Sequence, residues 1–245
     1  MFERLTAAGF EVLFTNHAEA ILRHDFHELI GELEAALLDL RLPITEIIGG
    51  GGGEAKMTQR LRRGLAKVAW TKHNFQMTKT VDGIPKESIS HEIDHVRRAD
   101  AGTVAFEIEW NNKDPFFDRD LENFKRLHAE GAISLGGIVT RGSEMQATMR
   151  ERVARFATDR GVQGFEGLVD FGAGSPTPPQ RKQMEADIAR GVSFAEAWSR
   201  KFTADKYGAA TTHWVKLQDR VARGVGNPCP LVLIGLPASI IDMGL

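Results

Sequence analysis

Apolar and polar residues alternate from residue 104 to residue 110, and this alternation constrains the fold more than any other feature of the sequence. Its apolar members are Val104, Phe106, Ile108 and Trp110. A period of two is typical of a half-buried β-strand, because successive side chains of a strand point to opposite faces of the sheet. Glu107 and Glu109 therefore share one face and lie about 6.6 Å apart along the chain.

A third carboxylate, Asp94, ends an earlier stretch, and a turn from Arg97 to Gly102 separates it from this strand. If the two segments pair as neighbouring strands, Asp94, Glu107 and Glu109 converge on one patch. Crowded carboxylates repel one another unless a hard cation lies between them, and oxygen ligands suit Mg²⁺. The pattern therefore predicts a magnesium site. The simpler alternative is that both glutamates belong to the solvent-exposed face of an amphipathic strand.

The earlier stretch also contains a second candidate metal site. The run His91-Glu92-Ile93-Asp94-His95 matches the pattern H-E-x-x-H, in which two histidines on one helix face bind zinc and the glutamate is the general base of a peptidase. The apolar residues around the run have helical spacing, but Pro85 and the turn at residues 100–102 leave little room for such a helix. A zinc metallopeptidase is therefore an alternative, and surface or phosphate-facing histidines are the simpler interpretation.

Charge and composition narrow the class of protein. The net charge is −2, yet the segment Ala55–Val81 has seven Lys and Arg and no acidic residue, which favours an anionic partner such as the DNA backbone. A smaller basic group, Lys216, Arg220 and Arg223, is equally consistent with a solvated helix face. No apolar run approaches the roughly 20 residues that cross a bilayer, and no secretion signal is recognisable, so we expect an intracellular protein.

Helical and strand patterns alternate along the rest of the chain. Helices are expected near residues 16–37, 58–67, 118–131, 143–156 and 213–223 and from residue 193, and buried strands at 133–139 and 231–236. Asp118 is the expected N-cap of its helix, and capping boxes are expected at Asn16, Ser143 and Ser193. Gly49 to Gly53 is interpreted as a linker. The order predicts an α/β fold, in which a mixed central β-sheet is flanked by helices, and a single domain over residues 1–245.

The sequence around the carboxylates resembles a known nuclease family. Asp94, Glu107 and Glu109 have the layout of the PD-(D/E)xK nucleases, with Glu109 in place of the usual lysine. Their surroundings resemble the type II restriction endonucleases of the BglII and BstYI group. The matching segments are Trp70–Phe75, Glu92–Asp94, Phe106–Asn112 and Ile138–Gly142, with weaker ones at Thr211–Trp214 and Cys229–Gly235. The resemblance implies a restriction-endonuclease-like core.

The resemblance also implies a role for individual residues. Asp94 and Glu107 would bind Mg²⁺, with the main-chain carbonyl of Ile108 as a further ligand. Glu109 would take the third catalytic position, where the best-known relative has glutamine, and Asn74 would assist at the active site. The implied DNA-binding residues are Asn111, Asn112, Lys113, Lys72, Arg141 and His213. Among these, Asn112 falls where the family places a base-reading asparagine.

We therefore expect a Mg²⁺-dependent type II site-specific deoxyribonuclease that acts as a homodimer on palindromic double-stranded DNA, because two-fold protein symmetry matches a palindrome. The resemblance further suggests a GATC-centred site and the cytoplasm of a prokaryotic cell. The alternatives are the zinc metallopeptidase, a structure-specific repair nuclease of the same fold, and a DNA-binding module without catalytic activity.

Overall fold

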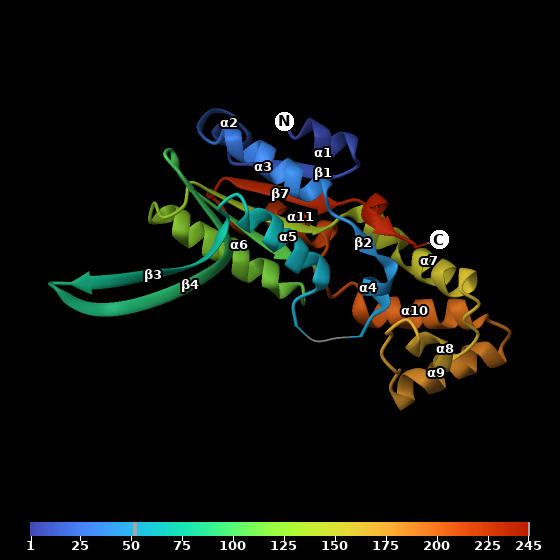
Figure 1. The fold of residues 1–245 in the computed structure, drawn as a ribbon. Helices are drawn as coiled ribbons and strands as arrows, with labels where there is room; N and C mark the ends of the chain where they lie inside the picture. Colours follow the sequence, from blue (N-terminus) through green and yellow to red (C-terminus); the bar gives the residue numbers. More distant parts are fainter. Residues whose placement is uncertain (51–52, 245) are drawn as a thin grey trace.

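A six-stranded mixed sheet forms the centre of the computed structural model, which describes residues 1–50 and 53–244 (Figure 1). The strand order is β1 (Glu11–Thr15), β7 (Leu231–Leu236), β6 (Leu135–Arg141), β5 (Gly102–Glu109), β4 (Ile84–Ala99) and β3 (Thr71–Val81). Strands β5, β6 and β7 are parallel, and the other pairs are antiparallel. The predicted mixed sheet flanked by helices is confirmed. Two short strands, β2 (Leu42–Pro43) and β8 (Ile241–Asp242), pair separately in parallel.

Helices cover both faces of the sheet, and β6 and β7 are buried along their whole length as a result. Val104 and Phe106 of β5 face the larger core. The helices of that core include α1 (Glu3–Ala7), α2 (Ala18–Asp25), α3 (His27–Leu38), α5 (Lys56–Ala66) and α7 (Ser143–Asp159). Ala105 faces a second core together with α6 (Pro115–Ala129) and α11 (Trp214–Ala222). The side chains of β5 thus alternate between two covered faces.

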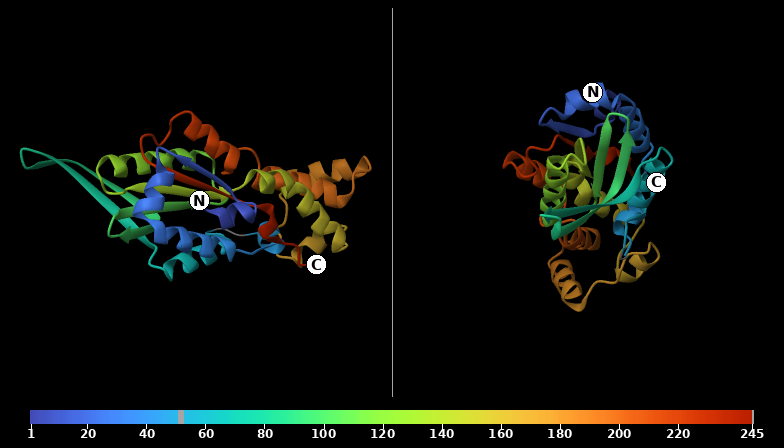
Figure 2. Two further views of the ribbon diagram at one scale, coloured as in Figure 1. Left: turned by 90° about the horizontal axis from the view of Figure 1, so that it is seen from above. Right: turned by 90° about the vertical axis from the view of Figure 1, so that its left-hand side faces the viewer.

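Strands β3 and β4 form a long hairpin that projects beyond the rest of the sheet (Figures 1 and 2). Its tip is a turn in which Asp82 and Gly83 have φ angles of 52° and 77°. Two successive residues with positive φ form the turn that matches the twist of a two-residue hairpin. Residues 78–88 are exposed, whereas the base of the hairpin pairs with β5. The turn before Gly102 is shorter than expected, because β4 continues to Ala99.

The region from residue 161 to residue 210 forms a helical extension beyond α7 (Figure 1). It contains α8 (Phe165–Val169), α9 (Pro178–Ala189) and α10 (Phe194–Lys206), and α10 packs against both α7 and α9. The Tyr207 hydroxyl donates to the main-chain oxygen of Ile47 in α4 (Ile44–Ile48). Of the expected linker Gly49–Gly53, Gly51 and Gly52 lie outside the described residues, and Gly50 donates to the main-chain oxygen of Gly172.

Helix α6 starts earlier than expected. Asp114 occupies its N-cap position and Pro115 its first turn, so the prediction of Asp118 as N-cap is wrong. Proline suits the first turn of a helix because its missing N–H would have no partner there. The capping box of Ser193 and Glu196 at α10 is confirmed.

The capping boxes predicted at two other helix starts are not formed. Asn16 has a positive φ and its amide donates to Asn227, so it does not cap α2, and the helix expected over residues 16–37 is interrupted at Phe26. Ser143 lies inside α7, where its hydroxyl donates to Glu11 instead of forming a capping box. In both cases a distant residue provides a hydrogen-bond partner that sequence spacing does not reveal.

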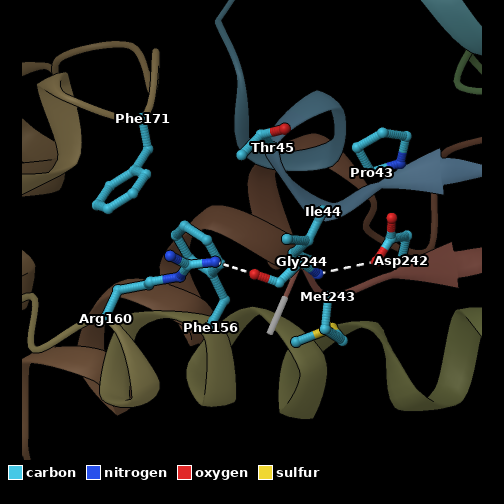
Figure 3. A pocket seen from close by; sticks show the side chains of 9 residues that line it. All are labelled: Pro43, Ile44, Thr45, Phe156, Arg160, Phe171, Asp242, Met243 and Gly244. Atoms are coloured by element: carbon cyan, nitrogen blue, oxygen red, sulfur yellow. Dashed lines mark hydrogen bonds between the residues drawn. The ribbon is translucent and has the colours of Figure 1, made fainter.

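One pocket includes residues near the C-terminal end of the described chain (Figure 3). It has a volume of about 260 Å³ and is lined by Pro43, Ile44, Thr45, Phe156, Arg160, Phe171, Asp242, Met243 and Gly244. None of the residues expected to act in catalysis or DNA binding lines this pocket. No helix among the described residues is long and apolar enough to cross a membrane.

Candidate active site

The two glutamates of β5 are buried, so the simple interpretation of a solvent-exposed face is wrong. Glu107 is 5% exposed and Glu109 is 3% exposed. Both follow Ala105 on the face of β5 that α6 covers. The side chain of Ile108, between them, packs in the core on the opposite face, which leaves its main-chain carbonyl as the only group that could bind a metal.

A fourth carboxylate, which the sequence analysis missed, joins them from α6. Asp120 is 1% exposed, and its Oδ2 atom has no hydrogen-bond partner among the described residues. Its Oδ1 atom pairs with Arg119 at 2.7 Å, and the same guanidinium lies 3.5 Å from Glu109. A signal was present in the sequence, because Asp120 occupies the apolar stripe of α6 between Phe117 and Phe124, where a carboxylate is unusual.

The burial of these acids makes their ionised forms unstable. Burial, then the charge of Asp120, raises the pKa of the Glu107 carboxyl to about 9. The same two causes raise the pKa of Glu109 to about 8, and burial raises the pKa of Asp120. Arg119 is the counter-charge of Asp120 and Glu109, whereas Glu107 has no ion pair among the described residues and takes up a proton. A cation that entered the cluster would displace this proton.

Asp94 lies beside this cluster, at an irregularity in β4. Thr71 pairs with Val96 and His73 with Ile93, so two residues of β4, Asp94 and His95, lie opposite one residue of β3. Bulges of this kind redirect side chains and are frequent next to active sites.

The bulge brings the main chain of Asp94 to Glu107, while the carboxylate of Asp94 is paired with a lysine. The Asp94 N–H donates to Glu107 Oε1 at 3.4 Å, whereas the Asp94 carboxylate pairs with Lys72 Nζ at 2.9 Å. Lys72 also pairs with Glu92 at 2.8 Å, and these two hydrogen bonds, with Glu92 first, raise the pKa of Lys72. Among the described residues, no three His, Cys, Asp or Glu side chains gather closely enough to hold a metal ion. Asp94 therefore lies next to Glu107, but the three predicted carboxylates do not converge on one point in this structure.

The zinc motif does not have the geometry that a zinc peptidase requires. Residues 91–95 lie on strand β4 and not on a helix, so His91 and His95 are about 13 Å apart along the chain at the usual rise of a strand. Both imidazoles are buried, and burial lowers the pKa of each. The metallopeptidase interpretation is therefore wrong. Asn74, expected to assist catalysis, is exposed on β3 and accepts a hydrogen bond from Ser90 at 2.6 Å.

The loop after β5 presents two of the predicted DNA-binding residues. Asn112 and Lys113 are exposed, and Asn111 is half-buried. The Asn112 amide donates to Glu109 Oε2 at 2.5 Å, so this side chain lies between the carboxylate cluster and solvent.

Arg141 and His213 are placed differently from what was expected. Arg141 has no exposed surface, and His213 is only 8% exposed at the N-cap position of α11. In this conformation Arg141 offers no surface to DNA and His213 offers little, so their predicted DNA contacts stay predictions. Burial lowers the pKa of both groups, to about 10 for Arg141.

Several cations of the two basic segments are paired within the chain. In α5, Arg60 pairs with Glu46 and Arg62 with Glu54. In α11, Arg220 pairs with Asp114 and Asp118, next to an open cleft of about 630 Å³. These acids lie outside the basic segments in the sequence, so the local charge is lower than the segments alone indicate.

Comparison with known families gives one match. The model of a family described as restriction endonuclease BglII/BglIII matches residues 10–236. A comparison with the curated proteins gives no match.

Proposed function

Because the chain belongs to the BglII/BglIII restriction endonuclease family, and is thus a type II restriction endonuclease that binds and hydrolyses DNA, we propose that it cuts both strands of a palindromic site with Mg²⁺ bound beside Glu107. The catalytic residues of this proposal are Asp94, Glu107 and Glu109. The proposal extends to a single nuclease domain over residues 1–245 and to an enzyme in the cytoplasm of a prokaryotic cell, together with the DNA that it cuts.

One observation carries this assignment. Two buried glutamates end β5 beside Asp94 on the neighbouring strand, and burial and mutual repulsion hold the pKa of Glu107 near 9. Such a cluster is costly for the folded protein. It is explained if a bound cation compensates the cost during the reaction.

The donors present fit Mg²⁺. Asp94 and Glu107 offer carboxylate oxygens, Ile108 offers a main-chain carbonyl, and Asp120 Oδ2 is buried without a hydrogen-bond partner among the described residues. All of these are hard oxygen ligands, which Mg²⁺ prefers. Mg²⁺, when bound, would lower the pKa of a water molecule and neutralise charge on the scissile phosphate.

The chain's own groups then have separate tasks. Asp94 and Glu107 would hold the cation, and Lys72 keeps Asp94 oriented through their 2.9 Å ion pair. Glu109, with a pKa raised to about 8, is increasingly ionised as the pH rises through 8 and can then accept a proton from the attacking water, and Asn112 orients it through the 2.5 Å hydrogen bond. Asn74 lies on the exposed side of β3 and would assist from there.

The loop of residues 110–114 is the proposed DNA-reading element. Asn112 can make a bidentate contact with adenine, and Lys113 can donate to guanine in the major groove. Asn111 supports the same loop. A homodimer would place two such loops on the two halves of a palindrome, which we propose to be GATC-centred.

Digestion of phage DNA with Mg²⁺ tests the function. A sequence-specific enzyme produces a fixed pattern of bands, whereas a structure-specific repair nuclease does not. We expect Asp94→Ala and Glu107→Ala to abolish cutting and to retain site binding in Ca²⁺. Exposed Glu87→Gln on the hairpin is the control and should cut normally. Cutting by either alanine variant would rule out the assigned residues.

A further inference from the structure

Arg141, the last residue of β6, carries a buried charge without a carboxylate partner among the described residues. Its Nη1 donates to Asn111 Oδ1 at 2.9 Å, and its Nη2 donates to Thr211 Oγ1 and to the Thr212 main-chain oxygen, both at 2.7 Å. All three acceptors are neutral. A buried cation with only neutral partners costs free energy that a hydrophobic residue would not cost. Stability alone does not explain an arginine at this position.

Two aromatic rings complete the surroundings of this guanidinium. Its Cζ atom lies 4.9 Å from the ring centre of Tyr207 and 5.6 Å from that of Trp110. The two rings contact each other edge to face, with their ring centres 6.2 Å apart. Attraction between a cation and aromatic rings offsets part of the desolvation cost. Trp110 is the first residue of one loop and Tyr207 immediately precedes another, so the cation lies where the two loops begin.

These two loops are residues 110–114, the β5 loop, and residues 208–213, the α11 loop. The N–H of Thr212 donates to the main-chain oxygen of Asn112 at 2.9 Å, and the N–H of Asp114 donates to that of Ala210 at 3.0 Å. The N–H of Asn112 donates to Thr212 Oγ1 at 3.2 Å. These hydrogen bonds join the two loops side by side, and Arg141 donates hydrogen bonds to both loops.

The same end of β6 also supports the catalytic strand. The hydroxyl of Thr140 donates to the main-chain oxygen of Glu109 at 2.8 Å. Glu109 in turn accepts from the side chain of Asn112. One short segment, Thr140 and Arg141, thus connects the end of β5 with the loop that we propose to read DNA.

We infer that Arg141 is a positioning residue, which fixes the β5 loop on the α11 loop and so sets the register of Asn112 over a base pair. The inference rests on the proposed function, because it assigns the β5 loop to DNA reading. Discrimination between bases depends on hydrogen-bond geometry that must hold within about 0.5 Å. A planar guanidinium with donors in a fixed fork can hold two loops in this way, whereas a lysine ammonium cannot.

The test compares Arg141→Lys and Arg141→Met with the wild-type enzyme. Cleavage rates are measured on the wild-type site and on sites with one changed base pair, and duplex binding is measured in Ca²⁺. We expect the ratio of cognate to near-cognate cleavage to fall about tenfold or more, because one good base contact contributes about that much discrimination. Affinity for random duplex should stay unchanged. A purely structural role would lower thermal stability and leave the ratio intact.

Control variants distinguish positioning from general damage. Arg97→Met removes another largely buried arginine of the sheet, which pairs with Glu32, and should leave the ratio unchanged. Thr211→Val removes one acceptor of Arg141 and should lower the ratio, whereas Thr211→Ser keeps the hydroxyl and should restore it. These two variants decide the question if the Arg141 variants do not fold.

The possible outcomes separate the inference from the function on which it rests. If wild-type enzyme gives no fixed fragments, the proposed function fails and the positioning role fails with it. If wild-type enzyme cuts specifically and Thr211→Val or Arg141→Lys keeps the wild-type ratio, only the positioning role is overturned.

Discussion

Replacement of Glu107 by glutamine should stabilise the metal-free protein at alkaline pH. The folded protein keeps a proton on Glu107 up to a pKa of about 9, whereas the ordinary value is 4.5. Between these values the folded state binds more protons than the unfolded state, so wild-type stability falls as the pH rises through this window. Glutamine does not titrate, and its carbonyl can still accept the hydrogen bond from the Asp94 N–H.

The expected magnitude follows from the same values. The interval from the ordinary pKa of 4.5 to pH 8 is about 3.5 pH units, and each unit corresponds to about 1.36 kcal/mol. The free energy of unfolding of Glu107→Gln at pH 8 should therefore exceed that of the wild type by at most about 5 kcal/mol. At pH 5 the gain should be below about 1 kcal/mol, because this pH lies only about 0.5 units above the ordinary pKa of 4.5, at the lower end of the window over which the gain accumulates.

Urea unfolding at pH 5 and pH 8, with and without Ca²⁺, measures both values. Ca²⁺ should stabilise the wild-type protein at pH 8 and have a much smaller effect on Glu107→Gln. The exposed Glu87→Gln serves as the control and should show no pH-dependent gain. Equal stability of wild type and Glu107→Gln at pH 8 would refute the view that burial raises the pKa of Glu107 in the metal-free protein.

Three further measurements address base recognition by Asn112, the packing around Gly137 and the accessibility of Cys229. Asn112→Ala should weaken specific over non-specific duplex binding by roughly 1–3 kcal/mol in Ca²⁺, and an equal loss on random duplex would instead make Asn112 a backbone contact. Gly137→Val should destabilise the protein by about 1–3 kcal/mol or more in urea unfolding, because a Cβ atom there would lie 2.3 Å from the ring of Phe106, and an unchanged midpoint would contradict this packing. Burial raises the pKa of Cys229 to about 12, so a thiol reagent at pH 8 should label it only after unfolding, and rapid labelling of the native protein would show that it is accessible.

Local patterns of residues were sufficient for the three parallel strands β5, β6 and β7 and for part of the site. The alternation at residues 104–110 predicted β5 and placed Glu107 and Glu109 on one face, and the apolar run at 231–236 predicted β7 at the bounds observed. These features depend on neighbours in sequence.

Other features depend on residues far apart in the chain, and no local pattern contains them. The run from His91 to His95 is compatible with either a helix or a strand, and pairing with β3 and β5 makes it a strand. The bulge at Asp94 comes from the register of that pairing, and it turns the carboxylate towards Lys72.

The sequence by itself determined which strand carries the acids and that they lie side by side. An alternation of period two indicates that a strand has two different faces, but it does not indicate which of them another element covers. Only the tertiary structure decided that α6 packs over the glutamates and adds Asp120, and that Arg141 is enclosed between two loops. The physical reason is that burial, and with it the pKa of Glu107, depends on contacts between segments that the chain brings together only when it folds.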